Sequence, residues 1–336
     1  MKRRVFILLG VMFFILTVAA VLIGSVRVGL LDIGKILSNH LFGSSYAVDG
    51  AKDSIIFDIR LPRVIVTILV GCALSTSGAV IQGVYRNPMA DTGVLGISSG
   101  ASLGAIIAIA TGLVSVNIYA MPAMAAVCAL LTAFGVFFFS SRKGKVPVLT
   151  LVLAGIAIST FLRAMVSLIL SCMEEGQMKE YLYWSMGSLS STRWEHVKLA
   201  VLPVVIGCGL LMWHSKELNI LMLGEEEAQS LGLNPYKIRK RLLFLVSLVT
   251  AIAVCVSGGI QFVGLVIPHM IRLTIGADNK ILIPASALGG ACFLLLCDLF
   301  ARTLVSPAEI AVGIVTAVIG APYFLYLIHR QRKGQI

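Results

Sequence analysis

Arginines placed among apolar residues are the side chains of this sequence best suited to chemistry. Arg60 and Arg63 stand in the segment RLPR before a long apolar run, and Arg302 stands in CDLFART at the end of another. A guanidinium group can bind a carboxylate through two parallel hydrogen bonds, and burying it in hydrocarbon is unfavourable. Arginines at such boundaries are expected to reach lipid headgroups or to pair with a nearby acid such as Asp58.

Arg163 lies inside an apolar run and belongs to a polar stripe. Ser159, Arg163, Ser167 and Ser171 recur every fourth residue, so they share one face of a helix. A charge inside a bilayer normally faces a protein interior or a watery cavity. Two interpretations stay open: a conduit lining that attracts anionic ligand groups, or a structural arginine bonded to neighbouring carbonyl groups.

A charged segment at residues 215–241 contains the stretch LMLGEEEAQSLGLN. The glutamates, Ala228 and Gln229 favour a short helix, and Gly232 stands where helices commonly end. A solvated connector is the ordinary interpretation of a charged loop. A connector has little need of exposed leucines, however, so we expect a partner surface here. The leucines expected to be exposed are Leu221, Leu223, Leu231 and Leu233.

The elements that must position these residues are membrane helices. Of the 336 residues, 58% are hydrophobic and 13% are charged, with a mean hydropathy of +0.96. A soluble domain needs a more charged exterior, whereas apolar runs of about 17–25 residues match a bilayer. We expect an all-α polytopic membrane protein with about ten transmembrane helices. The runs lie near residues 5–26, 64–85, 93–113, 116–140, 148–172, 197–214, 242–258, 260–275, 281–300 and 310–328.

The run near 260–275 is short and contains Pro268, so we expect it to be tilted or buried against other helices. The neighbouring His269 is interpreted as a hydrogen-bonded structural residue rather than a ligand. Small residues recur every fourth position in two other runs, which predicts close helix packing. They are Gly71, Ser75, Ala79 and Gly83 in the first, and Gly96, Gly100 and Gly104 in the second.

The net charge of +11 is explained by membrane topology, with basic residues on the cytoplasmic side, rather than by a nucleic-acid partner. With ten spans and a cytoplasmic start, the inside segments hold more of the 27 Lys and Arg residues than the outside segments, as the positive-inside rule requires. Both termini are then cytoplasmic, and segment 215–241 lies inside. Segments 27–63 and 173–196 lie outside, each with a short helix expected. The scattered cysteines and histidines lack metal-ligand spacing, so no metal site is expected.

Four segments carry a family resemblance: residues 60–105, GEEEAQSLGLN, GGIQFVGLVIPHMIRL and SPAEIAVGIVTAVIGAPYFLYLI. They resemble the integral-membrane subunit of bacterial ABC importers for iron–siderophore complexes, haem and vitamin B12, the FecCD-type permeases. The resemblance implies the BtuC-like type II fold, with one transmembrane domain over residues 1–336. It also implies a multi-pass protein of the bacterial cytoplasmic membrane.

The resemblance assigns roles to residues already singled out. Arg60, Arg63 and Arg302 would dock glutamates of a substrate-binding protein, and Asp298 could pair with Arg302 on one helix face. Met89, Val148 and Leu149 would form an inner gate, and Ser159, Arg163 and Ser167 would line the pathway. The residues implied in ATPase coupling are Leu223, Gly224, Glu225, Glu226, Ala228, Gln229, Leu231 and Gly232. Gly313, Ala317 and Ala321 form a further small-residue face, expected at a second permease subunit.

The implied assembly contains a second permease subunit, identical or paralogous, two ATPase subunits, and an extracytoplasmic binding protein. The sequence has no G-x-x-x-x-G-K-[ST] phosphate loop, so ATP and Mg²⁺ are expected on the ATPase and no enzymatic activity or cofactor on this chain. Ferric siderophore is the leading cargo, with haem or cobalamin as the alternatives. An ion-coupled secondary transporter is disfavoured because the Asp and Glu residues lie in loops and at span ends, and an inert scaffold is disfavoured by the coupling-type segment.

Overall fold

The computed structural model describes residues 2–24, 26, 28–141, 147–305 and 308–332, and its regular elements there are all helices. Positions 1, 25, 27, 142–146, 306–307 and 333–336, which fall in or beside predicted spans and loops, lie outside the described residues. The first elements are α1 (Lys2–Leu22), α2 (Leu30–Phe42), α3 (Gly50–Ser54), the π-helix η1 (Ile55–Arg60), α4 (Leu61–Val84), the 3₁₀ helix η2 (Thr92–Leu95), α5 (Ile97–Ala110), α6 (Leu113–Val116) and α7 (Ala120–Ser140). They are followed by α8 (Val148–Leu170), α9 (Glu175–Ser185), α10 (Trp194–Trp213), α11 (Ser215–Leu223), α12 (Glu225–Ser230), α13 (Pro235–Ser257), α14 (Val263–Ile275), α15 (Asn279–Thr303) and α16 (Val312–Arg332).

Each of the ten predicted apolar runs overlaps one of the ten longer apolar helices of the described chain. Among the described residues, 7 helices are long and apolar enough to cross a membrane, and three apolar helices are shorter: Ile97–Ala110, Val263–Ile275 and Val312–Leu327. At 1.5 Å per residue, the 13 residues of α14 reach roughly 20 Å, less than a hydrocarbon core of about 30 Å. Most of α14 is buried in the protein, which confirms the expectation for the run containing Pro268.

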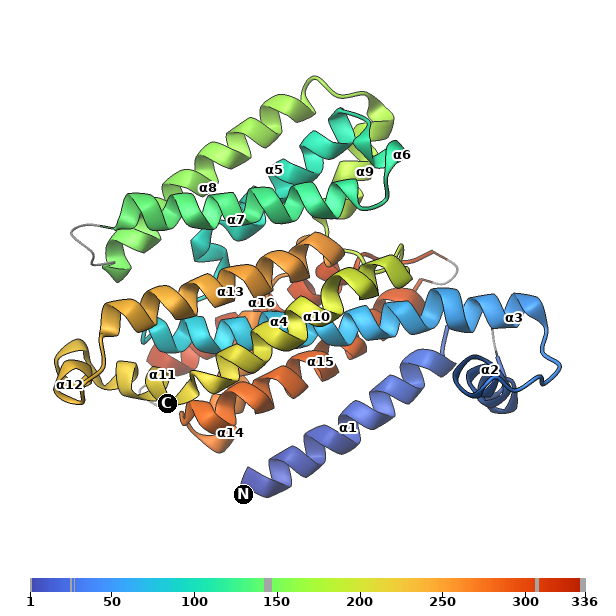
Figure 1. Ribbon diagram of the computed structural model, residues 1–336, viewed down its shortest axis with the longest axis horizontal. Helices are drawn as coiled ribbons and strands as arrows, with labels where there is room; N and C mark the ends of the chain where they lie inside the picture. The colour runs from blue at the N-terminus through green and yellow to red at the C-terminus, as the bar shows by residue number, and fades with distance from the viewer. Residues whose placement is uncertain (1, 25, 27, 142–146, 306–307, 333–336) are drawn as a thin grey trace.

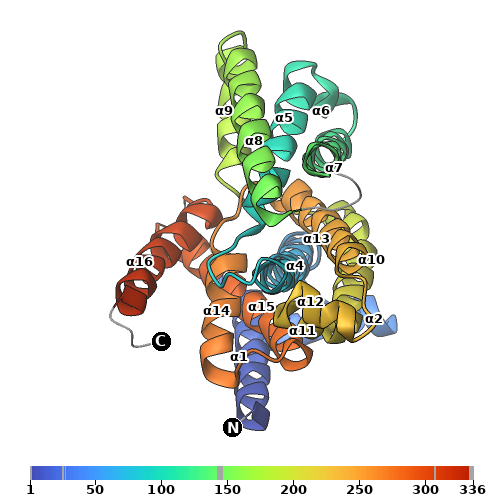
Figure 2. The ribbon, with the colours of Figure 1, turned by 90° about the vertical axis from the view of Figure 1, so that its left-hand side faces the viewer.

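Helix α4 forms the centre of the molecule, with α10, α13, α14 and α15 around it (Figure 2). It continues α3 and η1 without a break, so the apolar helix begins at Gly50 rather than near residue 64 as predicted. Pro62 would normally break a helix because its ring meets the carbonyl group four residues back. The π-turn provides the extra room: the N–H of Leu61 bonds the carbonyl of Ile56, five residues back.

Small residues let helix backbones approach each other closely within the bundle, as their recurrence at every fourth position predicted. A Cβ atom added to Gly71 would lie 2.5 Å from the carbonyl oxygen of Gly290 in α15. One added to Gly104 would lie 2.2 Å from the carbonyl oxygen of Met124 in α7. Both distances are far below a van der Waals contact, so neither glycine can be replaced without moving a helix.

At two glycines, the helix contacts in the structure differ from those that the sequence predicted. Gly78, outside the predicted stripe, lies against Gly264 of α14, where an added Cβ atom would be 1.9 Å from the carbonyl oxygen. Gly313 is buried against the carbonyl oxygen of Met186 in the same chain. The expectation that it contacts a second subunit is therefore wrong, because its close approach is already used internally.

Helices α5, α7, α8 and α9 form a second layer, seen above α13 in Figure 1. This layer joins the α4 bundle mainly through α7 and α5 on α13. Helix α8 packs on α5, α7 and η2, yet of its 23 residues only Leu151, Gly155, Ser159 and Leu162 are buried. One long side of α8 therefore has no partner among the described residues of this chain.

Candidate functional site

Arg60, Arg63 and Arg302 lie together with Asp298 and Glu309, and we call these five residues the arginine cluster. The Arg63 Nε atom donates to Asp298 Oδ1 over 2.9 Å, and its Nη1 atom donates to Glu309 Oε2 over 2.9 Å. Arg302 Nε lies 3.5 Å from Asp298 Oδ2. The predicted pairing of Asp298 with Arg302 is therefore confirmed, and Asp298 also binds Arg63 of α4.

The end of α1 and Val26, which follows it in the chain, supply the remaining acceptors of the arginine cluster. Arg60 donates to the carbonyl oxygens of Val21 and Leu22 over 2.8 and 2.9 Å, and also to that of Val26. Arg302 donates to the carbonyl oxygen of Ala20 over 2.8 Å. The last carbonyl groups of a helix lack intrahelical partners and carry partial negative charge, so two guanidinium groups suit this position.

These contacts bear directly on the predicted docking role. The three arginines are only 4–5% exposed, and their donors serve groups of this chain. Asp58 is exposed and has no ion pair with Arg60 among the described residues, so that suggested partner is wrong. The internal contacts tie α1, α4, α15 and the segment before α16 together. Docking of a binding protein stays a prediction, and it requires some of these contacts to open.

The segment predicted to couple to an ATPase, here called the coupling segment, contains α11 and α12, joined by Gly224. Gly224 has φ 146° and ψ 164°, a conformation that favours glycine. Ala228 is 1% exposed, so it anchors α12 to the chain instead of facing a partner. Gly232 follows α12 with φ 80°, which confirms the predicted helix end.

Glu225 fixes the beginning of α12 to α13. Its carboxylate accepts hydrogen bonds from Arg239 over 2.7 Å and from the Tyr236 hydroxyl over 3.0 Å. The hydrogen bond from Arg239 is the main reason that the pKa of Glu225 lies below its ordinary value. Burial opposes this lowering, and the hydrogen bond from Tyr236 adds to it. The sequence interpretation missed Arg239 and Tyr236, although both stand in the basic stretch that follows α12.

The outer side of the coupling segment is a small apolar and acidic surface. Leu223 and Leu231 are 62% and 61% exposed, and together with Glu226, Glu227 and Ser230 they line a shallow hollow. Gln229 is also exposed. Leu221 is 3% exposed and Leu233 is half-buried, so the expectation that all four leucines are exposed is wrong for Leu221. Leu221 faces inward because the core takes one face of α11.

The polar stripe of α8 divides between two environments. Ser159 is buried, and its Oγ atom lies close to Gly96. Arg163 and Ser167 are exposed on the side of α8 that has no partner here. Arg163 has no hydrogen bond or ion pair within residues 2–141 and 147–332 as far as these are described. This observation favours the pathway interpretation over a structural arginine bonded to carbonyl groups.

The predicted gate residues lie at the ends of helices. Met89 lies in the turn that follows α4. Its backbone N–H donates to Asn87 Oδ1 over 2.9 Å. Val148 is the first residue of α8, and Leu149 is 71% exposed. A gate formed by these residues stays a prediction, because closing a central pathway needs a second copy.

His269 is 8% exposed, and both ring nitrogens lack a hydrogen-bond partner among the described residues. Its interpretation as a hydrogen-bonded residue is therefore wrong. No group of three or more His, Cys, Asp or Glu residues that could hold a metal ion occurs in the described part of the chain.

Comparisons with known proteins match this architecture. The FecCD transport family model matches residues 12–330. The chain is 41% identical over 335 residues to the hemin transport system permease HmuU of Yersinia pestis, covering 97% of this chain and 96% of that protein. It is 42% identical over 284 residues to the cobalamin import system permease BtuC of Halobacterium salinarum, covering 84% and 75%. An inward-facing metal-chelate type ABC transporter superposes with a TM-score of 0.86 at 32% identity, covering 98% of this chain and 100% of that one. The chain therefore belongs to the FecCD transport family and is a multi-pass ABC importer permease.

Proposed function

We propose that this permease takes up ferric siderophore by alternating access, driven by two separate ATPase subunits. The observation that carries the proposal is the family match over residues 12–330. The exposed Leu223 and Leu231 on the coupling segment support it, because apolar side chains in a charged loop suit a protein partner. ATP and Mg²⁺ would be held by the ATPase, so this chain would be a transport subunit and not an enzyme.

The proposed assembly is symmetric about a central pathway. A second permease, identical or paralogous, would cover the exposed side of α8, where Arg163 and Ser167 would then face a shared conduit. An extracytoplasmic binding protein would deliver the cargo on the opposite side from α12. Closure of the ATPase pair would move α11 and α12 and switch the pathway between outward and inward access. In this orientation both termini lie in the cytoplasm.

Haem is the second candidate cargo. The observation that favours it is the 41% identity to a hemin permease over 97% of this chain. Cobalamin has comparable support from the cobalamin permease, which matches 84% of this chain. Uptake of each labelled cargo by a deletion strain that expresses this permease separates the three candidates: the true cargo is imported and is displaced only by its own unlabelled form.

Coupling is tested in proteoliposomes that contain the permease and its ATPase partner. Leu223→Asp with Leu231→Asp should abolish ATP-driven uptake, because both side chains are exposed and would lose an apolar contact without disturbing the fold. Leu31→Asp on α2, which is 82% exposed, is the matched control and should transport normally. Normal uptake by the double variant would reject the coupling surface, and uphill transport without ATPase or ATP would reject the proposed function.

A further inference from the structure

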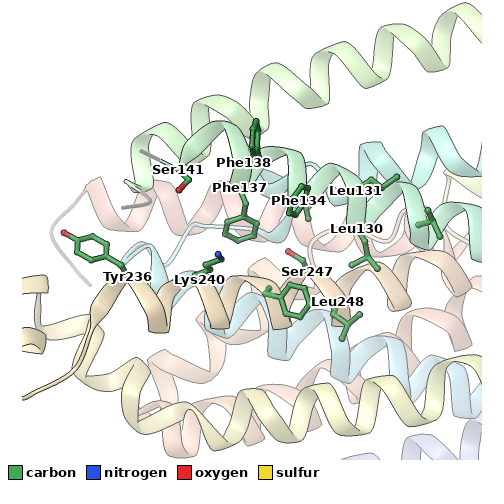
Figure 3. A pocket seen from close by; sticks show the side chains of 13 residues that line it. Leu130, Leu131, Phe134, Phe137, Phe138, Ser141, Tyr236, Lys240, Ser247 and Leu248 are labelled. Carbon is green, nitrogen blue, oxygen red and sulfur yellow. The ribbon is translucent and has the colours of Figure 1, made fainter. Parts of the chain in front are cut away.

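An apolar groove between α7 and α13 has no role in the proposed transport cycle. The hollow has a volume of about 690 Å³. Figure 3 shows Leu130, Phe134 and Phe137 of α7 facing Leu248 and Ser247 of α13 across it. Its outer side chains, Leu131, Phe134 and Phe244, are 59–69% exposed. Because both helices are long and apolar enough to cross a membrane, this groove opens toward the hydrocarbon of the bilayer.

One end of the groove is polar. Ser141, Tyr236 and Lys240 line it there, next to the beginning of α13 and the coupling segment (Figure 3). Lys240 stands four residues before Phe244, so its ammonium group and the aromatic wall share one face of α13. Lys240 is exposed and makes no ion pair with any residue that the structure describes. No acidic residue lines the groove.

This arrangement defines the chemistry of the occupant. A long apolar wall in the hydrocarbon region requires an apolar chain, and the Lys240 cation beside the Ser141 hydroxyl at one end suits a phosphate. A soluble cargo lacks the apolar chain, and an isolated acyl chain leaves Lys240 without a partner. We propose that the groove binds one anionic phospholipid, with its acyl chain along Phe134 and Leu130 and its phosphate at Lys240.

The leaflet follows from the orientation in the proposed function, on which this part of the inference rests. If α12 contacts an ATPase, then Lys240 lies at the cytoplasmic surface, where anionic lipids attract basic side chains. The bound lipid would then touch α13 one residue from Arg239, which holds Glu225 of the coupling segment. The groove itself, and its preference for an anionic headgroup, require only that α7 and α13 cross the membrane.

The experiment measures lipids retained by the full chain. The permease is purified in mild detergent, exchanged into an equal mixture of phosphatidylglycerol and phosphatidylcholine, and analysed by native mass spectrometry. Wild-type protein should retain one phosphatidylglycerol in preference to phosphatidylcholine. Lys240→Gln should reduce that retention about fivefold, the effect of about one basic contact. Lys216→Gln, an exposed lysine of α11 outside the groove, is the matched control and should change nothing.

A second variant separates the acyl chain from the headgroup. Val127 lines the groove and is 52% exposed, so Val127→Trp should fill the hollow without disturbing the core and should reduce retention of both lipids. Equal retention of phosphatidylglycerol by wild type and Lys240→Gln, or a groove occupied by a helix of another copy in cross-linking, overturns the proposal. This readout needs no ATPase and no cargo, so failure of the coupling test leaves it intact, and the reverse also holds.

Discussion

At the scale of single residues, Asp298 holds the arginine cluster together. Its side chain is fully buried in the described structure and lies within 2.8 Å of Arg63 Nη2 and 3.5 Å of Arg302 Nε. The pairing with Arg302 was predictable because four residues on one helix bring two side chains to the same face. The pairing with Arg63 was not, since the two residues are 235 positions apart in the sequence, and only the fold brings α4 beside α15.

Replacing Asp298 tests the importance of this cluster. Asp298→Asn keeps the shape but leaves Arg63 and Arg302 buried with less compensating charge, so we expect a loss of about 3–5 kcal/mol in stability. The measurement is the apparent melting temperature of the purified permease. Lys179→Gln, which removes an exposed pair with Glu175, should leave the melting temperature nearly unchanged. Equal melting temperatures for wild type and Asp298→Asn would show that the cluster is not needed for stability.

Glu225 gives the attachment of α12 a pH dependence. A carboxyl group whose folded pKa is lowered stabilises the fold above its unfolded pKa, near 4.3, and this stabilisation disappears as the pH falls through the folded value. Amide hydrogen exchange in α12, corrected for intrinsic rates, should therefore accelerate between about pH 5 and 3. Glu225→Gln should exchange fast at both ends of that range, whereas Glu226→Gln, at an exposed position, should follow the wild type. Identical pH profiles for all three proteins would contradict the role of Glu225.

At the scale of elements, hydropathy predicted where the ten apolar helices lie but not where they begin. The helix starting at Gly50 extends about 14 residues beyond the predicted run, because the π-turn before Pro62 lets the helix continue past the apolar residues. Glycine spacing predicted a close helix contact at Gly71, and the structure shows that its partner is α15. The glycine spacing missed the contact of Gly78 with α14, because α4 is packed on all sides and one stripe of small residues describes only one side.

Gly78→Ala examines how α4 and α14 are held together. The added methyl group would lie 1.9 Å from the carbonyl oxygen of Gly264, and backbone cannot yield as a side chain does. We expect the two helices to separate, with poor yield of folded protein and a lower melting temperature. Gly10→Ala in α1, where nothing lies within 4 Å of the added atom, should melt at or above the wild-type temperature. A normal melting temperature for Gly78→Ala would mean that this contact is looser than described.

At the scale of the whole molecule, the described chain has two unequal halves. Helix α4 is buried on every side by the helices around it, whereas α8 leaves a long side without a partner among the described residues. The family resemblance predicted the permease fold over nearly the whole length, as the family match confirms. It could not predict the cargo, because relatives named for hemin and cobalamin match this chain comparably well.

The exposed Arg163 has a consequence for biosynthesis. On the uncovered side of α8, a newly inserted copy presents a guanidinium group to acyl chains, an arrangement that membranes tolerate poorly. In the proposed assembly, a copy that has not yet bound its second permease would be a natural substrate for membrane proteases until that permease covers this side of α8. Degradation of this kind would keep the amount of this permease equal to that of its second subunit, so that unassembled copies do not accumulate.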